Sequence, residues 1–244
     1  MRSELISSTL VKMVSHEHLR NMLAKRIDDY IYKSIAANAD EDLEKVRLRR
    51  YQFMSAMLSC VVRNIDKGYV NGEITKKIIK VLIQKNFIRR DSDSDLAANR
   101  FKEKYGQFPP TFIVFSPTQK CNLKCIGCYA ASASDTAATI PFTIVDRVVR
   151  EVHDYFGARF ITISGGEPFV YKSEGKTLLD IFEKYNDIYF LVYTNGLVIN
   201  DKTAQRLAKA RNVTPAISVE GFEAETDGRR GQAFISGYWR LLNF

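Results

Sequence analysis

From residue 111 onward the chain alternates short apolar runs with amphipathic runs, and this alternation constrains the fold more than any other feature. Strands are expected at 111–116, 159–164, 188–194 and 214–219, and helices at about 141–156, 176–186, 201–210 and from about 232. Each connection leaves room for one right-handed crossover helix, so neighbouring strands should be parallel. The sequence therefore predicts an α/β domain whose strands all end at the same edge of one sheet.

The first ninety residues carry a different pattern, with apolar residues recurring at helical spacing. Helices are expected over about 5–37, 42–67 and 72–85. The polar run Asp91-Ser-Asp-Ser-Asp95 then suggests a boundary, and Pro109-Pro110 favours an extended start to the first strand. We therefore expect a helical domain over residues 1–90, a linker over 91–110 and the α/β domain over 111–244.

Composition excludes few functions. Hydrophobic residues make up 45% of the chain and charged residues 26%, yet no apolar run approaches the ~20 residues that a membrane-spanning helix needs. No N-terminal signal pattern is visible either, so a cytoplasmic location is expected. The net charge of +8 permits nucleic-acid binding, and basic residues cluster at 45–50 and 76–90. A solvated helix face explains these clusters more simply, which leaves a nucleic-acid partner unsupported.

Three cysteines fall within eight residues, at Cys121, Cys125 and Cys128. Three thiolates can hold three corners of a [4Fe–4S] cluster and leave the fourth iron free to bind a substrate or cofactor. Structural zinc is the main alternative, but its fourth ligand would have to come from far away in sequence, for example from Cys60 or His153. Disulfides and unligated thiols are further alternatives. The spacing favours the iron–sulfur site.

Polar and glycine-rich motifs follow the later strands. They are Gly165-Gly166-Glu167-Pro168, Thr194-Asn195-Gly196 and Ser218-Val219-Glu220. Functional sites of βα barrels are built at the carboxyl ends of the strands, which is where these motifs should meet the cysteines. Each motif by itself is equally compatible with an ordinary turn.

The CxxxCxxC spacing after an apolar strand, with GGEP about forty residues later, resembles the radical S-adenosylmethionine (SAM) superfamily. The resemblance covers roughly residues 110–234. It implies a partial (βα) barrel core and a [4Fe–4S] cluster held by Cys121, Cys125 and Cys128. It further implies reductive cleavage of SAM to methionine and a 5′-deoxyadenosyl radical, which abstracts hydrogen from a substrate that the motifs do not name. An electron donor of the flavodoxin or ferredoxin type is implied as a partner.

The resemblance also implies cofactor-binding residues. The GGEP segment resembles the loop that receives the SAM ammonium group, with glycines that allow close backbone approach and a proline that fixes the turn. Ser218 matches a serine that the family uses toward SAM. Thr194 and Asn195 stand where they could reach the cofactor or substrate, and Tyr129 is placed to cover the cluster.

Three departures from the family pattern leave alternatives open. Gly127 stands where many relatives have an aromatic residue, and Glu220 stands where relatives often have Asp. Only four of the expected six strands are visible, so the chain is expected to be truncated after the fourth βα unit, with an open sheet and an exposed SAM pocket. The alternatives are a non-catalytic remnant that retains iron–sulfur or metal binding, and a basic nucleic-acid binder with a zinc site. Cys60 is expected to be a core residue of a helix.

Overall fold

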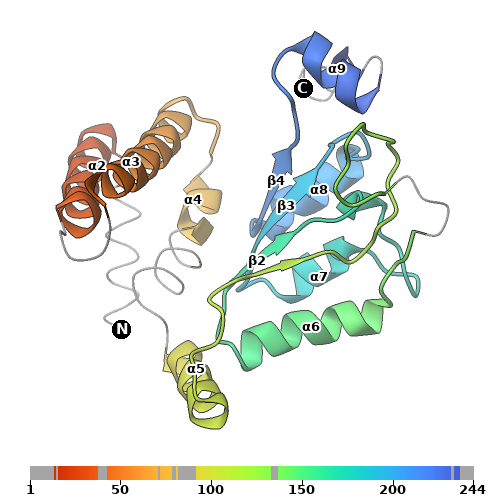
Figure 1. Cartoon of the computed structure of the whole chain (residues 1–244), viewed down its shortest axis with the longest axis horizontal. Coiled ribbons are helices and arrows are strands. Elements are labelled where there is room, and N and C mark those ends of the chain that lie inside the picture. Colours follow the sequence, from red (N-terminus) through yellow and green to blue (C-terminus); the bar gives the residue numbers. More distant parts are fainter. Residues whose placement is uncertain are drawn as a thin grey trace. The chain divides into compact units, whose positions relative to one another are not determined.

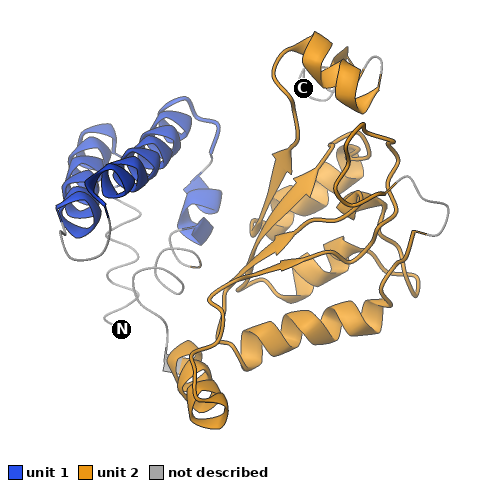
Figure 2. Ribbon diagram, in the orientation of Figure 1, with its two compact units in different colours: residues 1–80 blue, residues 81–244 orange. Residues whose placement is uncertain are grey.

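The computed structural model describes residues 14, 16–37, 43–70, 72–78, 81, 92–132, 137–231 and 234–236. The chain forms two compact units, residues 1–80 and residues 81–244 (Figure 2). The boundary between these units lies about ten residues before the expected one at residue 90. The expected final helix from about 232 falls largely outside the described residues.

The first unit is helical, as predicted (Figure 1). Helix α2 (Glu17–Ile31) continues into a π-helical turn, η1 (Tyr32–Ala36), and is followed by α3 (Glu44–Asp66) and α4 (Gly72–Ile78). Aromatic and polar contacts join α2 and its extension to α3. The rings of Tyr32 and Tyr51 meet edge to face at 5.2 Å, and the Tyr51 hydroxyl donates to Asp28 at 2.9 Å. Arg20 and Asp66 form an ion pair between the same helices.

Helix α3 leaves much of its surface uncovered. None of its residues is fully buried, and Phe53, Met57 and Val61 are all exposed. The expectation that Cys60 is a core residue is wrong, because its side chain is exposed as well. Its described partners, α2 and η1, cover only part of a helix of 23 residues.

The second unit contains the predicted parallel sheet. Its strands are β1 (Ile113–Phe115), β2 (Phe160–Ile163), β3 (Tyr189–Thr194) and β4 (Val213–Ile217), and they lie in the order β1-β2-β3-β4. Helices α6 (Phe142–Asp154), α7 (Leu178–Lys184) and α8 (Asp201–Ala210) connect them in turn (Figure 1). The short helix α9 (Glu223–Arg230) follows β4 and was not expected.

Helix α6 supplies much of the core on one face of the sheet. Val145, Val149 and Val152 recur at helical spacing, are almost fully buried, and belong to the same core cluster as Ile161 and Ile163 of β2. These valines form one apolar face, because residues three and four positions apart lie on the same side of a helix. Packing of α6 against β2 therefore holds this face of the sheet in place.

The segment expected to be a linker contains a helix instead. Helix α5 spans Ser92–Tyr105, and Ala97 and Ala98 are buried. Its first turn contains acidic residues, and their negative charge stabilises the helix by interacting with the positive end of the helix dipole. The Phe101 ring contacts that of Phe156 at 5.3 Å, so α5 is anchored to the segment that follows α6. A polar sequence was mistaken for a linker because its apolar contacts come from residues about fifty positions away.

Pro215 occupies a strand position that tolerates the loss of an N–H. The carbonyl of Asn212 accepts from Phe190 at 2.8 Å, and the N–H of Ser218 donates to Thr194 at 2.9 Å. Bonding positions alternate along a strand, so the even-numbered residues of β4 face β3 and Pro215 faces away. Among the described strands β4 has β3 as its sole neighbour, and a proline on such an edge costs no ladder bond.

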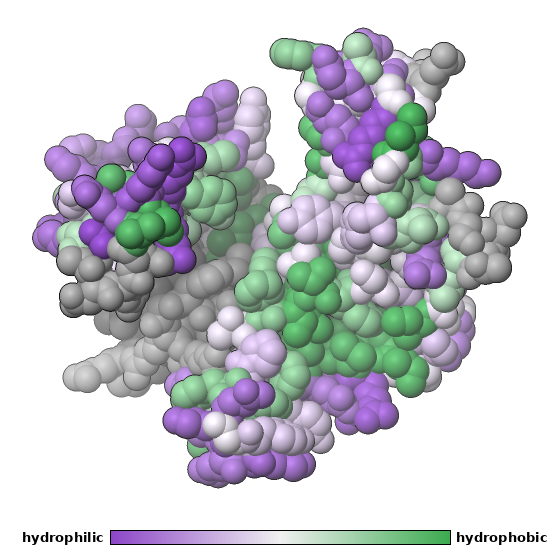
Figure 3. Space-filling model, viewed as in Figure 1, coloured by the Kyte–Doolittle hydropathy of each residue, from purple (hydrophilic) through white to green (hydrophobic). Residues whose placement is uncertain are grey.

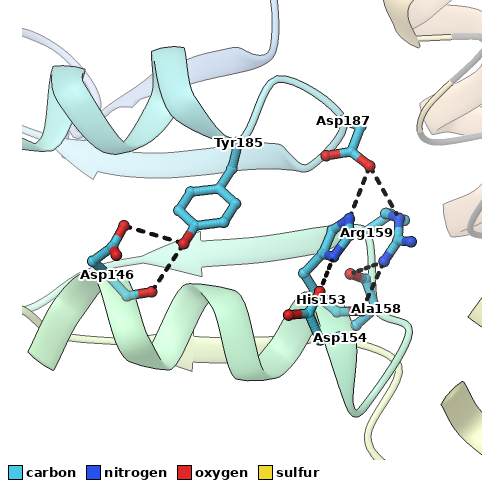
Figure 4. Close-up of polar contacts among 7 residues, drawn as sticks. All are labelled: Asp146, His153, Asp154, Ala158, Arg159, Tyr185 and Asp187. Carbon is cyan, nitrogen blue, oxygen red and sulfur yellow. Dashed lines mark hydrogen bonds and ion pairs between the residues drawn. The ribbon is translucent and has the colours of Figure 1, made fainter.

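A polar cluster holds the amino ends of β2 and β3 (Figure 4). His153 contacts Asp154 through Nδ1 at 2.7 Å and Asp187 through Nε2 at 2.9 Å, and the buried Arg159 also pairs with Asp187. This cluster lies at the sheet edge opposite the cysteine loop. His153 is therefore not placed to serve as the distant fourth ligand that a zinc site would need.

Candidate active site at the carboxyl ends of the strands

One cavity opens at the carboxyl ends of the strands of the second unit. All of the predicted site residues except Pro168 line it. The remaining described lining residues are Leu123, Ser132, Ser164, Tyr193, Arg229 and Arg230. The parallel sheet brings these segments together because every strand ends at the same edge.

The cysteine loop lies between β1 and α6. Its three thiols are partly exposed and form no disulfide. The N–H of Cys128 donates to the carbonyl of Cys125 at 3.3 Å, which closes a turn around Ile126 and Gly127. Gly127 has a φ of +68°, in the left-handed region that favours glycine. This conformation accounts for the glycine at this position.

The thiols have different electrostatic environments. Burial raises the pKa of Cys121, whereas the backbone N–H of Ser132 lowers the pKa of Cys128. Ligation needs the thiolate form, which the positive charge of bound iron strongly favours. In the described part of the chain no three acidic, His or Cys side chains converge on a single-ion site. A cubane iron–sulfur cluster would take one thiolate on each of three irons, so its three cysteine ligands would stand around the cluster. The three thiols of this chain likewise border one cavity.

Glu167 joins the ends of β2 and β3. Its carboxylate is 1% exposed and accepts three hydrogen bonds, from Phe169 N–H at 3.0 Å, Thr194 Oγ1 at 2.7 Å and Asn195 N–H at 2.8 Å. Burial raises the pKa of Glu167, while these donors act in the opposite direction. The carboxylate thus accepts hydrogen bonds from the protein itself, and Glu167 links the ends of β2 and β3 beside the cavity.

Gly165 and Gly166 lie against the backbone that leads into the cysteine loop. The N–H of Gly166 donates to Thr118 O at 2.8 Å, and the N–H of Glu167 donates to Lys120 O at 2.8 Å. A methyl group on Gly166 would stand 2.1 Å from Lys120 O, and one on Gly165 would stand 2.7 Å from Thr118 O. These glycines are therefore required for packing against the loop before Cys121, in addition to any approach of a cofactor.

Asn195 links the end of β3 to the cysteine loop. Its Nδ2 donates to Asn122 Oδ1 at 2.8 Å, and its Oδ1 accepts from Leu197 N–H at 3.0 Å. Thr194 uses its hydroxyl to bond Glu167 and to accept from Gly196 N–H at 2.9 Å. Both side chains are buried and committed to protein partners, although both border the cavity.

Tyr129 reaches across the mouth of the cavity. Its ring is 79% exposed, and its hydroxyl lies 2.5 Å from Ser164 Oγ and 3.4 Å from Gly165 N, just after β2. Ser218 borders the same cavity at the end of β4, where its backbone bonds Thr194. The hydroxyl contact to Ser164 was not predicted, since the two residues are 35 positions apart.

Sequence reasoning missed Arg229 and Arg230. Both belong to α9 and line the cavity with the cysteines. Glu220 pairs with both, accepting from Arg229 Nη1 at 2.7 Å and from Arg230 Nη2 at 2.5 Å. Adjacent arginines shortly after a strand-end glutamate were the available signal. They were overlooked because α9 itself was not predicted.

Residues 115–242 match the family model of the radical SAM superfamily. This span exceeds half of the chain and contains all three cysteines together with the GGEP, TNG and Ser218 motifs. The chain belongs to the radical SAM superfamily. The resemblance that the cysteine spacing and GGEP suggested is confirmed, and so is the four-stranded parallel α/β core.

Two curated relatives illustrate the extent of the similarity. The chain is 27% identical over 119 residues to an Fe-coproporphyrin III synthase of Methanosarcina barkeri, which covers 49% of this chain and 29% of the relative. It is 27% identical over 129 residues to the subtilosin biosynthesis protein AlbA of Bacillus subtilis, covering 52% and 28% respectively. The chain therefore matches less than a third of the length of either relative.

A solved structure, that of Streptococcus suis SuiB bound to S-adenosylmethionine, is also similar. It shares 20% identity with this chain at a TM-score of 0.46 and covers 72% of this chain and 40% of its own. In the described residues of our structure no helix is long and apolar enough to cross a membrane.

Proposed function

We propose that this chain is a radical SAM enzyme that binds a [4Fe–4S] cluster and SAM in the cavity described above. One observation carries the proposal: three unpaired thiols and the ends of three strands border one cavity inside the region that matches the family. A three-thiolate site leaves one iron for a cofactor, which a fully ligated cluster does not.

Cys121, Cys125 and Cys128 would hold the cluster. When bound, such a cluster supplies the electron that cleaves SAM to methionine and a 5′-deoxyadenosyl radical for hydrogen abstraction from a substrate. The turn around Gly127 keeps Cys125 and Cys128 on the same loop while leaving their thiols accessible. The backbone N–H of Ser132 lowers the pKa of Cys128, which favours the thiolate form that ligation needs.

The strand-end residues would share the remaining work unequally. Ser218 and the backbone of Gly165 border the cavity and would contact SAM. Glu167, Thr194 and Asn195 are bonded to one another or to the cysteine loop, so they would shape the pocket rather than contact the cofactor. Tyr129 would restrict access of water from the open side, which favours radical chemistry.

The wider setting follows from this chemistry. Reductive cleavage needs a one-electron donor, for which a flavodoxin or ferredoxin in the cytoplasm is the proposed partner. The two relatives described above have names that refer to different products, and the chain covers under a third of each. The proposed reaction is SAM cleavage followed by hydrogen abstraction.

Anaerobic reconstitution of the full chain with iron and sulfide tests the proposal. The product should hold about four irons per chain and show a sulfide-dependent visible chromophore. Replacing Cys121, Cys125 or Cys128 by Ala should abolish it, whereas Cys60→Ala, in the first unit, serves as the matched control and should retain it.

Two further measurements complete the test. SAM should change the electron paramagnetic resonance spectrum of the reduced protein, and dithionite with SAM should yield 5′-deoxyadenosine. Stoichiometric zinc without a sulfide-dependent chromophore would overturn the cluster assignment. A normal cluster whose spectrum ignores saturating SAM would overturn the cofactor assignment.

A further inference from the structure

Helix α9 is held against the cysteine loop by polar contacts. Its surface is hydrophilic (Figure 3), and Thr226 is its one fully buried residue. A reciprocal pair of bonds joins it to the loop. Ile126 N–H donates to Arg229 O at 2.9 Å, and Arg229 Nε donates to Ile126 O at 3.2 Å. Ile126 lies between Cys125 and Cys128, so these two hydrogen bonds anchor the turn that carries two of the three thiols.

Glu220 fixes the arginine that makes this contact. Its two carboxylate oxygens bond Arg229 and Arg230 separately, at 2.7 and 2.5 Å. Its own N–H donates to the buried hydroxyl of Thr226 at 3.0 Å. The pKa of Glu220 is lowered, chiefly by Arg230, so the carboxylate is ionised at neutral pH. Charge-assisted bonds of this kind restrict the arginine side chains more than neutral ones would.

The three side chains carry a net charge of +1 beside the thiols. Both arginines line the same cavity as Cys121, Cys125 and Cys128. Glu220 has a side-chain exposure of 23%, and Arg229 and Arg230 have 45% and 13%. Charges this close to a partly enclosed site are screened less than charges in open solvent. A positive charge favours the more negative, reduced form of any redox group in the cavity.

We propose that Arg229, aimed by Glu220, is a positioning residue for the cluster. It holds the Cys125–Cys128 turn through Ile126, and the Glu220–Arg229–Arg230 group sets the local charge that favours reduction. This inference rests on the proposed function, because it needs a cluster on the three cysteines. Residues outside the ligand loop would thereby tune the reduction potential of that cluster.

Potentiometric titration of the reconstituted full chain, without SAM, tests the inference. Arg229→Gln removes a positive charge and should shift the reduction equilibrium about tenfold toward the oxidised form, which is about 59 mV for one electron. Glu220→Gln removes a negative charge and should shift it in the opposite direction. Arg229→Lys keeps the charge and should restore most of the parent potential. Lys202→Gln on α8 controls for net charge and should change nothing.

The opposite signs distinguish charge tuning from simple damage, because a purely structural role would move both variants the same way. Glu220→Gln keeps Arg229 and carries the test even if Arg229→Gln assembles too little cluster to titrate. Potentials of both variants equal to that of the parent, or shifted in the same direction, would overturn the inference while leaving the proposed function intact. Failure of the parent to assemble a cluster would instead overturn the proposed function.

Discussion

The carboxylate of Glu167 accepts a hydrogen bond from the backbone N–H of Asn195 at 2.8 Å, which joins the loops after β2 and β3. Asn195 in turn donates to Asn122, in the cysteine loop, also at 2.8 Å. Three strand-end segments are thus joined through hydrogen bonds of the buried residues Glu167 and Asn195. The rigidity of the candidate site depends on residues that need not touch a cofactor.

Replacing Glu167 by Ala should destabilise the second unit by about 3 kcal/mol, because the donors of Phe169, Thr194 and Asn195 lose their acceptor in a buried place. Urea unfolding measures the loss. Glu103→Ala removes an exposed carboxylate of α5 and should stay within about 0.5 kcal/mol of the parent. Equal effects of the two substitutions would contradict the role assigned to Glu167.

Replacing Gly166 by Ala should lower both stability and iron uptake. The added methyl group would meet the backbone carbonyl of Lys120 at 2.1 Å, and Lys120 directly precedes Cys121. From the sequence alone we would expect a bulky residue at Gly166 to weaken the response to SAM and leave iron content intact. The packing of Gly166 reverses the second half of that expectation. Iron content after reconstitution, measured with the unfolding midpoint, decides between the two outcomes.

Gly228→Ala is the matched control for this substitution. It adds the same methyl group inside α9, where no atom lies within 4 Å. Alanine is the better helix former by about 1 kcal/mol, so the variant should be as stable as the parent or slightly more stable. Its iron content should be unchanged. A parent-like iron content in Gly166→Ala as well would show that the loop accommodates the methyl group.

Replacing Tyr129 by Phe should weaken the response of the cluster to SAM without lowering the stability of the protein. The hydroxyl bond to Ser164 is lost, but the ring is 79% exposed, so the unfolding free energy should change by less than about 0.5 kcal/mol. The spectroscopic response of the reduced cluster to SAM should weaken. Ser164→Ala removes the other partner and should have the same effect. Unchanged SAM responses in both variants would show that this contact does not cover the site.

His153 should make stability depend on pH near neutrality (Figure 4). The hydrogen bond to Asp187 raises the pKa of His153 in the folded state. The stabilisation is therefore complete below the unfolded pKa of about 6.5 and is lost as the pH rises through the higher folded pKa. His153→Gln should flatten urea-unfolding stability over this window, whereas the exposed His18→Gln should leave its slope unchanged. A parent-like slope in His153→Gln would refute the assignment.

Local sequence was enough to predict much of the architecture. Strand and helix periodicity gave the four parallel strands and their connecting helices, because alternation and helical spacing report which face of an element is buried. Cysteine spacing and GGEP indicated the family, since both motifs lie within short segments. The shared edge of parallel strands then brought Cys121, Gly165, Thr194 and Ser218 to one cavity.

Contacts between distant residues decided the rest, and no local pattern encodes them. Helix α5 was mistaken for a linker because its aromatic partner Phe156 lies in a later segment. The sequence predicts Glu167 as a cofactor-binding residue but does not reveal its hydrogen bonds to Thr194, at the end of β3, and to Asn195, just after it, which are 27 and 28 positions away. Arg229 and Ile126 are separated by 103 residues. The sequence determined which groups reach the sheet edge, whereas only tertiary packing determined which of these groups form hydrogen bonds with one another.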